Sequence, residues 1–135
     1  MSDPERAVQG AILQRLKDEA ALRPLLGTSP RVFDQAPAEA VHPYLVFGRA
    51  ETRPLNAEGG GFEHRLSLNC VSRYGGAEEA KAVVGLVRTC LDGAALAMSG
   101  WRCVDLRVTY ADVFRASDVR TTYGVVRVRA VVEAG

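Results

Sequence analysis

The chain has 135 residues, of which 47% are apolar and 24% are charged, and its formal net charge is +1. These values exclude a disordered or low-complexity chain and indicate one globular domain, residues 1–135. The chain lacks the excess of basic residues that is typical of nucleic-acid-binding domains. Its apolar runs are shorter than the ~20 residues of a membrane-spanning helix, and its first residues do not resemble a secretory signal.

The cysteines Cys70, Cys90 and Cys103 are odd in number and lack C-x-x-C spacing. This pattern argues against a disulfide framework and against a zinc site. We therefore expect buried, reduced thiols in an intracellular protein. The cationic residues are nearly all arginine, which either suits planar, bidentate contacts at interfaces or reflects genomic base composition.

The N-terminal segment predicts a helix that starts at Pro4 and is capped by Asp3. Its apolar stripe recurs at every fourth residue, and we expect the helix to end before Pro24 or at Gly27. The stripe consists of Val8, Ile12, Leu16 and Ala20.

A first group of strands follows this helix. Residues 31–34 indicate a short strand, and residues 44–47 are apolar on both sides, which predicts a strand covered on both faces that extends to Arg53. The glycine-rich residues 55–61 predict the tip of a long hairpin. From residue 62 to 70 apolar and polar residues alternate, which indicates a half-buried strand with His64 and Cys70 on its apolar face.

A second helix is predicted from Ala77 to Asp92, closed by Gly93. Glu78 and Glu79 lie in its first turn, where negative charge complements the helix dipole. Its buried stripe follows a period of 3.6 residues and consists of Ala80, Val83, Val84, Val87 and Leu91.

The last third of the chain predicts two strands. In the first, the apolar face would hold Val104, Leu106, Val108 and Tyr110, with a bulge near residues 111–112 where the alternation slips. Residues 116–121 predict a turn. The last strand would bury Val126, Val128, Ala130 and Val132.

This order of elements predicts an α+β fold with two helices packed on one face of an antiparallel sheet of about four to five strands, including a long β-hairpin. The other face of the sheet would be polar, and it either is solvated or meets a partner through arginine contacts. Its predicted side chains are Arg65, Ser67, Asn69, Asp105, Arg107, Thr109, Arg127 and Arg129.

The residues show no pattern of a catalytic, metal or cofactor site. His64 and Cys70 share a strand face but lie six residues apart, about 20 Å at the rise of a strand, which is too far for a catalytic pair. His42 has no evident partner, and the glycines at 75 and 76 lack the remainder of a phosphate-binding loop. We therefore expect no catalytic residues, no metal and no cofactor, and a binding or structural role rather than an enzyme.

Several stretches together carry a resemblance to a known family. They are residues 31–37 (RVFDQAP), 42–48 (HPYLVFG), 63–73 (EHRLSLNCVSR), 78–81 (EEAK) and 122–130 (TYGVVRVRA). Their order and spacing, from about residue 6 to 133, resemble the tail-completion or tail-terminator proteins of long-tailed phages and prophages, especially those of gene transfer agents.

This resemblance implies a structural protein that forms a hexameric ring on the tail tube, ends tube polymerisation and joins the tube to the head-side connector or stopper protein. DNA would pass through the lumen, and near-neutral charge suits passage without retention. The protein would be made in the cytoplasm, have no membrane partner and become part of a phage-like particle. The alternatives are a head–tail stopper or other small morphogenesis protein and, from another class, a small ligand-binding domain or enzyme.

A ring needs two different patches that meet between neighbouring subunits. The candidate contacts with other subunits or with the tube are inferred from the predicted hairpin tip, the polar sheet face and the turn at 116–121. They are Asn56, Glu58, Gly60, Phe62, Arg65, Arg107, Arg115, Arg120, Arg127 and Arg129. Plain solvent exposure is the alternative for each of them.

Overall fold

The fold is described from a computed structural model that covers residues 3–55 and 60–135. Helix α1 runs from Pro4 to Lys17, and the Asp3 side chain accepts a hydrogen bond from the Arg6 amide at 2.9 Å, as the sequence predicts. Val8, Ile12 and Leu16 are fully buried.

The first helix ends earlier than predicted. After Lys17 the chain forms a 3₁₀ turn, η1 (Ala20–Leu22), and a short helix, α2 (Arg23–Leu26), which stops at Gly27 with φ 99°. The Glu19 side chain accepts a hydrogen bond from the Ala21 amide and so starts the new turn. The change of direction buries Leu22 and Leu26, while Ala20 is exposed, so the predicted stripe stops at Leu16.

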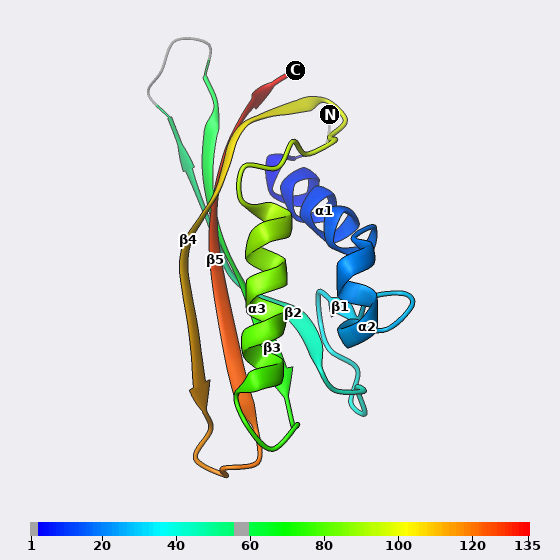
Figure 1. Ribbon diagram of the computed structural model, residues 1–135. Coiled ribbons are helices and arrows are strands. Elements are labelled where there is room, and N and C mark those ends of the chain that lie inside the picture. Colours follow the sequence, from blue (N-terminus) through cyan, green and yellow to red (C-terminus); the bar gives the residue numbers. More distant parts are fainter. Residues whose placement is uncertain (1–2, 56–59) are drawn as a thin grey trace.

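Five strands form one sheet in the order β1-β2-β3-β5-β4. Strand β1 (Val32–Phe33) pairs in parallel with β2 (Tyr44–Pro54), and all other pairs are antiparallel. The remaining strands are β3 (Phe62–Ser72), β4 (Trp101–Arg115) and β5 (Thr122–Ala134). Figure 1 shows the long, twisted sheet with the helices on one side only, which confirms the predicted α+β class.

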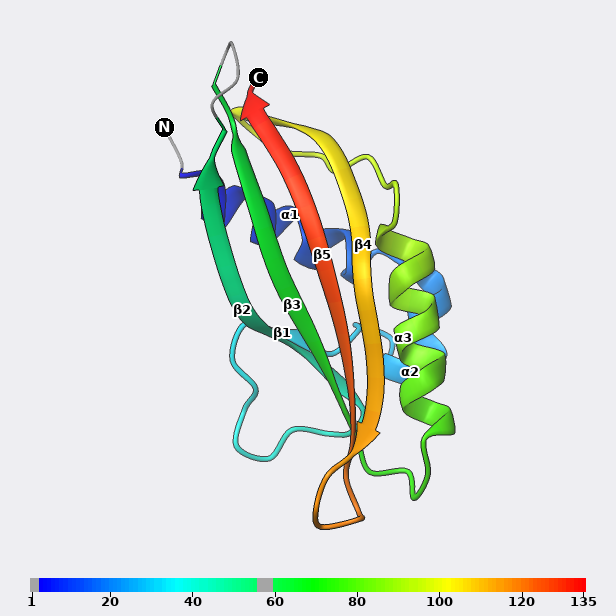
Figure 2. The ribbon, with the colours of Figure 1, turned by 90° about the vertical axis from the view of Figure 1, so that its left-hand side faces the viewer.

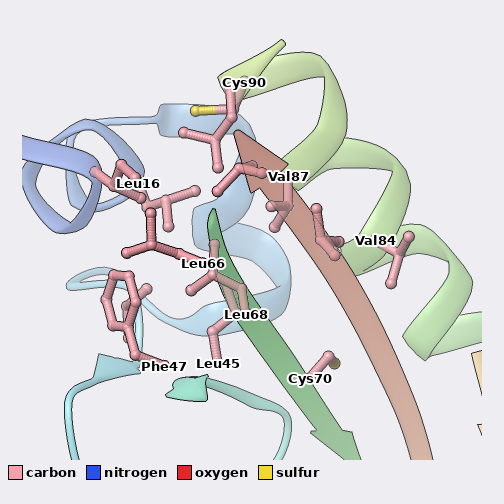
Figure 3. Packing of buried hydrophobic residues seen from close by; sticks show 14 of the residues in the cluster. Leu16, Leu45, Phe47, Leu66, Leu68, Cys70, Val84, Val87 and Cys90 are labelled. Atoms are coloured by element: carbon pink, nitrogen blue, oxygen red, sulfur yellow. The ribbon is translucent and has the colours of Figure 1, made fainter. Parts of the chain in front are cut away.

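The core lies between the sheet and two long helices, α1 and α3 (Glu78–Leu91). The predicted α3 stripe is confirmed: Ala80, Val83, Val84, Val87 and Leu91 are all buried. Figure 3 shows how side chains from α1, α3 and the strands converge in this layer. Gly124 on β5 permits close packing, because a Cβ there would lie 2.6 Å from Val84 Cγ2 on α3.

The two faces of the first long strand differ from the prediction. Leu45 and Phe47 are buried against the helices, whereas Tyr44 and Val46 are half-buried on the opposite side of the sheet. The expected covering on both faces is wrong, because the layer of helices lies on one face only (Figure 2).

Strand β4 also differs. Its register against β5 shifts between Cys103 and Asp105 and between Val108 and Tyr110, so the bulges precede the predicted position at 111–112. Each bulge adds a residue and reverses the side-chain alternation. As a result Leu106 is buried and Val108 half-buried, but Val104 is 55% and Tyr110 45% exposed, which corrects the predicted apolar face.

Both hairpins are as predicted. Strands β2 and β3 are closed by the hydrogen bond from the Leu55 amide to the Gly61 carbonyl at 3.0 Å; residues 56–59 of the predicted tip lie outside the described residues. Strands β4 and β5 are joined by the turn at 116–121. Within the described ranges, none of the helices is long and apolar enough to cross a bilayer.

Candidate functional site: the open sheet face

The side of the sheet without helices, here called the open face, is left uncovered by the other elements of the fold (Figure 2). Strand alternation and register assign its side chains. They are Tyr44, Val46, Glu51, Arg53, Glu63, Arg65, Ser67, Asn69, Val71, Asp105, Arg107, Tyr110, Asp112, Phe114, Tyr123, Val125, Arg127, Arg129 and Val131.

The half of the open face near the β2–β3 hairpin tip carries a network of alternating charges across three strands. Glu63 Oε1 accepts from Arg65 Nε at 3.2 Å, and Glu63 Oε2 accepts from Arg129 Nε at 2.6 Å. Asp105 continues the network, since its Oδ1 accepts from Arg107 Nε at 3.1 Å and its Oδ2 lies 3.9 Å from Arg129 Nη1. Three arginines and two carboxylates are thereby held in one connected group.

Glu63 is at the centre of this network. Only 13% of its side chain is exposed, and hydrogen bonds from Arg129 and then Arg65 lower the pKa of its carboxyl group below the ordinary value of 4.5. Because both carboxylate oxygens accept from guanidinium groups, the Glu63 carboxylate is held between Arg65 and Arg129. The network therefore presents a defined pattern of charge.

A shallow depression of about 310 Å³ lies at the middle of the open face. The β2 register shift between Phe47 and Ala50 and the β4 bulge at Thr109 lie on either side of it. Arg127 crosses this region, and its guanidinium carbon lies 4.7 Å from the ring centre of Tyr110. The lining residues are Arg49, Glu51, Arg65, Leu66, Ser67, Thr109, Arg127 and Val128.

The far half of the open face, toward the β4–β5 turn, is apolar. A groove of about 390 Å³ is lined by Val46, Asn69, Val71, Phe114, Tyr123 and Val125. Phe114 remains 46% exposed, and its ring centre lies 5.7 Å from that of Tyr123. The open face thus divides into a charged half and an apolar half.

The structure brings the sheet-face arginines together but not the other candidates. Arg65, Arg107 and Arg129 belong to the charge network, and Arg127 stacks on Tyr110. Arg115 ends β4, and Arg120 lies in the turn at the opposite end of the sheet.

The predicted hairpin-tip contacts have different outcomes. Asn56 and Glu58 lie outside the described residues. Gly60 is exposed with φ 73°. Phe62 is half-buried, with its ring centre 5.8 Å from that of Trp101, so it packs within the molecule.

The sequence pattern places Glu63 and Asp105 on this surface but leaves out Tyr110 and Phe114, and it does not show that Glu63 bonds to Arg129. Alternation along the strand already places Glu63 beside Arg65, but its partner Arg129 is 66 residues away along the chain. The alternation of residues predicts Tyr110 on the opposite face, because the bulge that moves it leaves no clear mark in the residue pattern.

The described side chains offer no activated nucleophile. His64 is 2% exposed on the helix-covered face; its Nδ1 lies 3.1 Å from Thr52 Oγ1, its buried Nε2 has no partner, and burial lowers its pKa. Burial also raises the pKa of Cys70 to about 12 and that of Cys90 to about 11, so both thiols stay protonated. Across residues 3–55 and 60–135, no cluster of three His, Cys, Asp or Glu side chains is placed to hold a metal ion.

Comparisons with solved structures find a close likeness. A chain of the structure described as "Virion of native gene transfer agent (GTA) particle" is 28% identical, superposes with a TM-score of 0.87, and covers 98% of this chain and 100% of its own length. A second structure, 14% identical with a TM-score of 0.55 over 99% of this chain and 97% of its own, shows the fold alone. A search among proteins of curated function found no significant match.

Residues 10–133 match the sequence profile of the family described as "Tail completion protein gp17". This match covers nearly the entire chain, including all five strands of the sheet. The chain therefore belongs to the tail completion protein gp17 family, whose members are structural proteins and not enzymes.

Proposed function

We propose that residues 1–135 act as one domain that terminates the tail of a gene transfer agent or a related prophage-derived particle. The observation that carries this proposal is the likeness, over 98% of the chain, to a component of a gene transfer agent virion. The protein would be made in the cytoplasm and then built into the particle.

In this proposal the protein forms a hexameric ring on the end of the tail tube, stops tube polymerisation and presents a surface to the head-side connector or stopper protein. A ring of identical subunits joins one patch of each subunit to a different patch of its neighbour. The unlike halves of the open face, with Arg65, Arg107, Arg127 and Arg129 in the charged part, support such contacts.

DNA would pass through the lumen of the ring without being held. Two observations favour this role: the net charge of the chain is +1, and three arginines of the open face are already paired with carboxylates. Paired arginines release fewer counterions from DNA than free ones, so they bind it weakly. Arg115, Arg120 and the hairpin-tip residues Asn56, Glu58, Gly60 and Phe62 remain proposed contacts with the tube or with other subunits.

The test is polymerisation of the purified tail-tube protein with increasing amounts of this protein. We expect tubes to shorten as the ratio rises, with a ring visible on one tube end by electron microscopy and a ring mass in native mass spectrometry. Gly85→Ala, on a site where a Cβ meets nothing within 4 Å, is the matched control and should act as wild type.

A head–tail stopper gives a different result, since it binds the connector but leaves tube length unchanged. A protein that neither forms rings nor changes tube length contradicts the proposal.

A further inference from the structure

Each of the two edges of the sheet is covered along only part of its length. Strand β1 pairs with β2 only at Leu45 and Val46. On β4, the Leu106 carbonyl accepts from the Gly93 amide at 2.8 Å, and the Val108 amide donates to Asp92 Oδ1 at 3.0 Å. Among residues 3–55 and 60–135, no other segment bonds to the outer side of residues 50–55 of β2 or of residues 110–115 of β4.

The hairpin closures define which backbone groups face outward on these free segments. The Leu55 amide bonds inward to Gly61, so in an antiparallel ladder the outward groups of β2 belong to Thr52 and Pro54. On β4 the Ala116 amide bonds inward to the Thr121 carbonyl at 2.8 Å, so the outward backbone groups of β4 belong to every second residue before Ala116. These are Ala111, Val113 and Arg115.

We infer that residues 110–115 of β4 pair in antiparallel fashion with residues 50–55 of β2 in a second copy of this chain, so that the sheet continues from subunit to subunit. This inference rests on the proposed ring and specifies its contact. Strand direction supports it, because β2, β3, β5 and β4 alternate in direction and a following β2 continues the alternation (Figure 2).

Charge selects the register of this pairing. With Val113 opposite Thr52, the outward groups of both strands meet, and Asp112 lies opposite Arg53 on the open face. In the described residues Arg53 has no carboxylate within ion-pair distance, and Asp112 accepts only from the Tyr110 hydroxyl at 3.2 Å. A shift by two residues places Asp112 opposite Glu51, and like charges directly opposite one another are destabilising.

Two features of the β2 edge disfavour pairing with other strands. Pro54 has no amide to donate, and the register shift near Gly48 interrupts the β2 edge. Such features protect an exposed edge from indiscriminate strand pairing. In the inferred register Pro54 lies opposite Ala111 and needs only to accept through its carbonyl, so the edge admits a partner whose pattern matches it.

The geometry of a closed ring agrees with this register. Within one copy, the residue of β3 that lies level with Asp112 across the sheet is Asn69, and the residue of β3 paired with Arg53 is Glu63. These two β3 residues are six positions apart, which is the stagger that the inferred pairing introduces between neighbouring copies. That separation is ~20 Å along the strands, while four strands per copy span ~19 Å across them. A stagger of this ratio tilts the strands by about 45° from the ring axis, at the upper end of the range found in closed barrels.

The test is a cysteine cross-link between subunits. A non-hydrogen-bonded antiparallel pair brings Cα atoms to about 4.5 Å, a distance that a disulfide bridges. We expect the double variant Asp112→Cys/Arg53→Cys, oxidised in the presence of tail tubes, to give a ladder of covalent multimers on a non-reducing gel. Each single variant should run as a monomer on the same gel. The shifted pair Asp112→Cys/Glu51→Cys should give far fewer covalent multimers.

Charge reversal provides an independent measurement. We expect Asp112→Arg or Arg53→Asp alone to lower the ring fraction about tenfold or more, and the two together to restore it, because opposite charges face each other again. Asp18→Arg and Arg88→Asp make the same changes of charge at exposed positions outside the two segments inferred to pair, and they should leave the ring fraction unchanged.

The outcomes separate the two proposals. The inferred contact is overturned if the wild type forms rings and caps tubes but the Asp112→Cys/Arg53→Cys variant gives no ladder. It is also overturned if all charge-reversal variants have equal ring fractions. Either result leaves the proposed function standing. Wild-type protein that forms no rings and leaves tube length unchanged overturns the proposed function, and the contact inferred from it falls too.

Discussion

Arg129 on β5 donates from Nε to Glu63 Oε2 on β3 at 2.6 Å, and this bond joins the central strands of the open face. Arg65 occupies the other oxygen of Glu63, so one carboxylate organises two of the four arginines predicted from the sequence. The consequence is that Arg65 and Arg129 are oriented by Glu63 before any partner arrives.

Replacement of Glu63 by Gln should remove this organisation. Guanidinium hydrogen bonds lower the pKa of Glu63 below 4.5, so its contribution to stability is complete above pH 4.5 and is lost as the pH falls through the lowered pKa. We expect Glu63→Gln to lower Tm by a few degrees at pH 7 and by less at pH 3, below the ordinary pKa of 4.5. Differential scanning calorimetry at both pH values measures this effect.

Glu51→Gln is the control for this prediction, because its pair with Arg49 at 3.7 Å is exposed and such pairs contribute little. Equal losses of Tm in the two variants at pH 7 would contradict a special role of Glu63.

His64 should make the protein sensitive to mild acid. Burial lowers its pKa below the ordinary value of 6.5, so the unfolded chain takes up this proton at a higher pH than the folded chain. The stability from neutral His64 is therefore complete above pH 6.5 and declines as the pH falls below it. We expect Tm to drop between pH 7 and 5.5 in the wild type and to change less in His64→Leu; an unchanged slope in the variant argues against this origin.

Gly124→Ala should destabilise the protein by about 1–3 kcal/mol, the usual cost of overpacking a core. The added Cβ would meet Val84 Cγ2 at 2.6 Å and Cys70 Cβ at 3.3 Å. We expect part of this loss to be recovered in Gly124→Ala/Val84→Ala relative to the sum of the single changes, as measured by urea unfolding.

The matched control is Gly85→Ala in α3, where the new Cβ has open space. It should stabilise the helix by up to about 1 kcal/mol. Destabilisation at both glycines would show that α3 does not pack as described.

Val119 should be a site where substitution stabilises the free protein. It has φ 54° in the β4–β5 turn and is 70% exposed, so a branched side chain adopts a left-handed conformation without burial. We expect Val119→Asn to raise stability by about 1 kcal/mol, since Asn tolerates this conformation better. Val41→Asn, at an exposed valine outside the left-handed region, should change Tm little; no difference between the two contradicts the assignment of strain.

Much of the fold follows from local patterns in the sequence. The stripe from Ala80 to Leu91 and the alternation from His64 to Cys70 appear because a helix or strand with one buried face repeats its apolar residues at its own period. The same alternation placed Arg65, Arg107, Arg127 and Arg129 on one face. The family resemblance likewise follows from the order of short sequence stretches.

Tertiary structure alone decided how these elements combine. The helix ends at Lys17 because burial of Leu22 and Leu26 outweighs continuation to Ala20, and the bulges of β4 follow from its register against β5. The bond between Glu63 and Arg129 and the uncovered stretches of both edges likewise depend on strand pairing between distant segments. In unbroken elements such as α3 and β3 the sequence by itself determined which residues share a face, since that needs only the period of one element. The faces of the bulged strand β4 and the partners across the sheet needed the three-dimensional register, in which a shift of one residue moves every side chain to the other face.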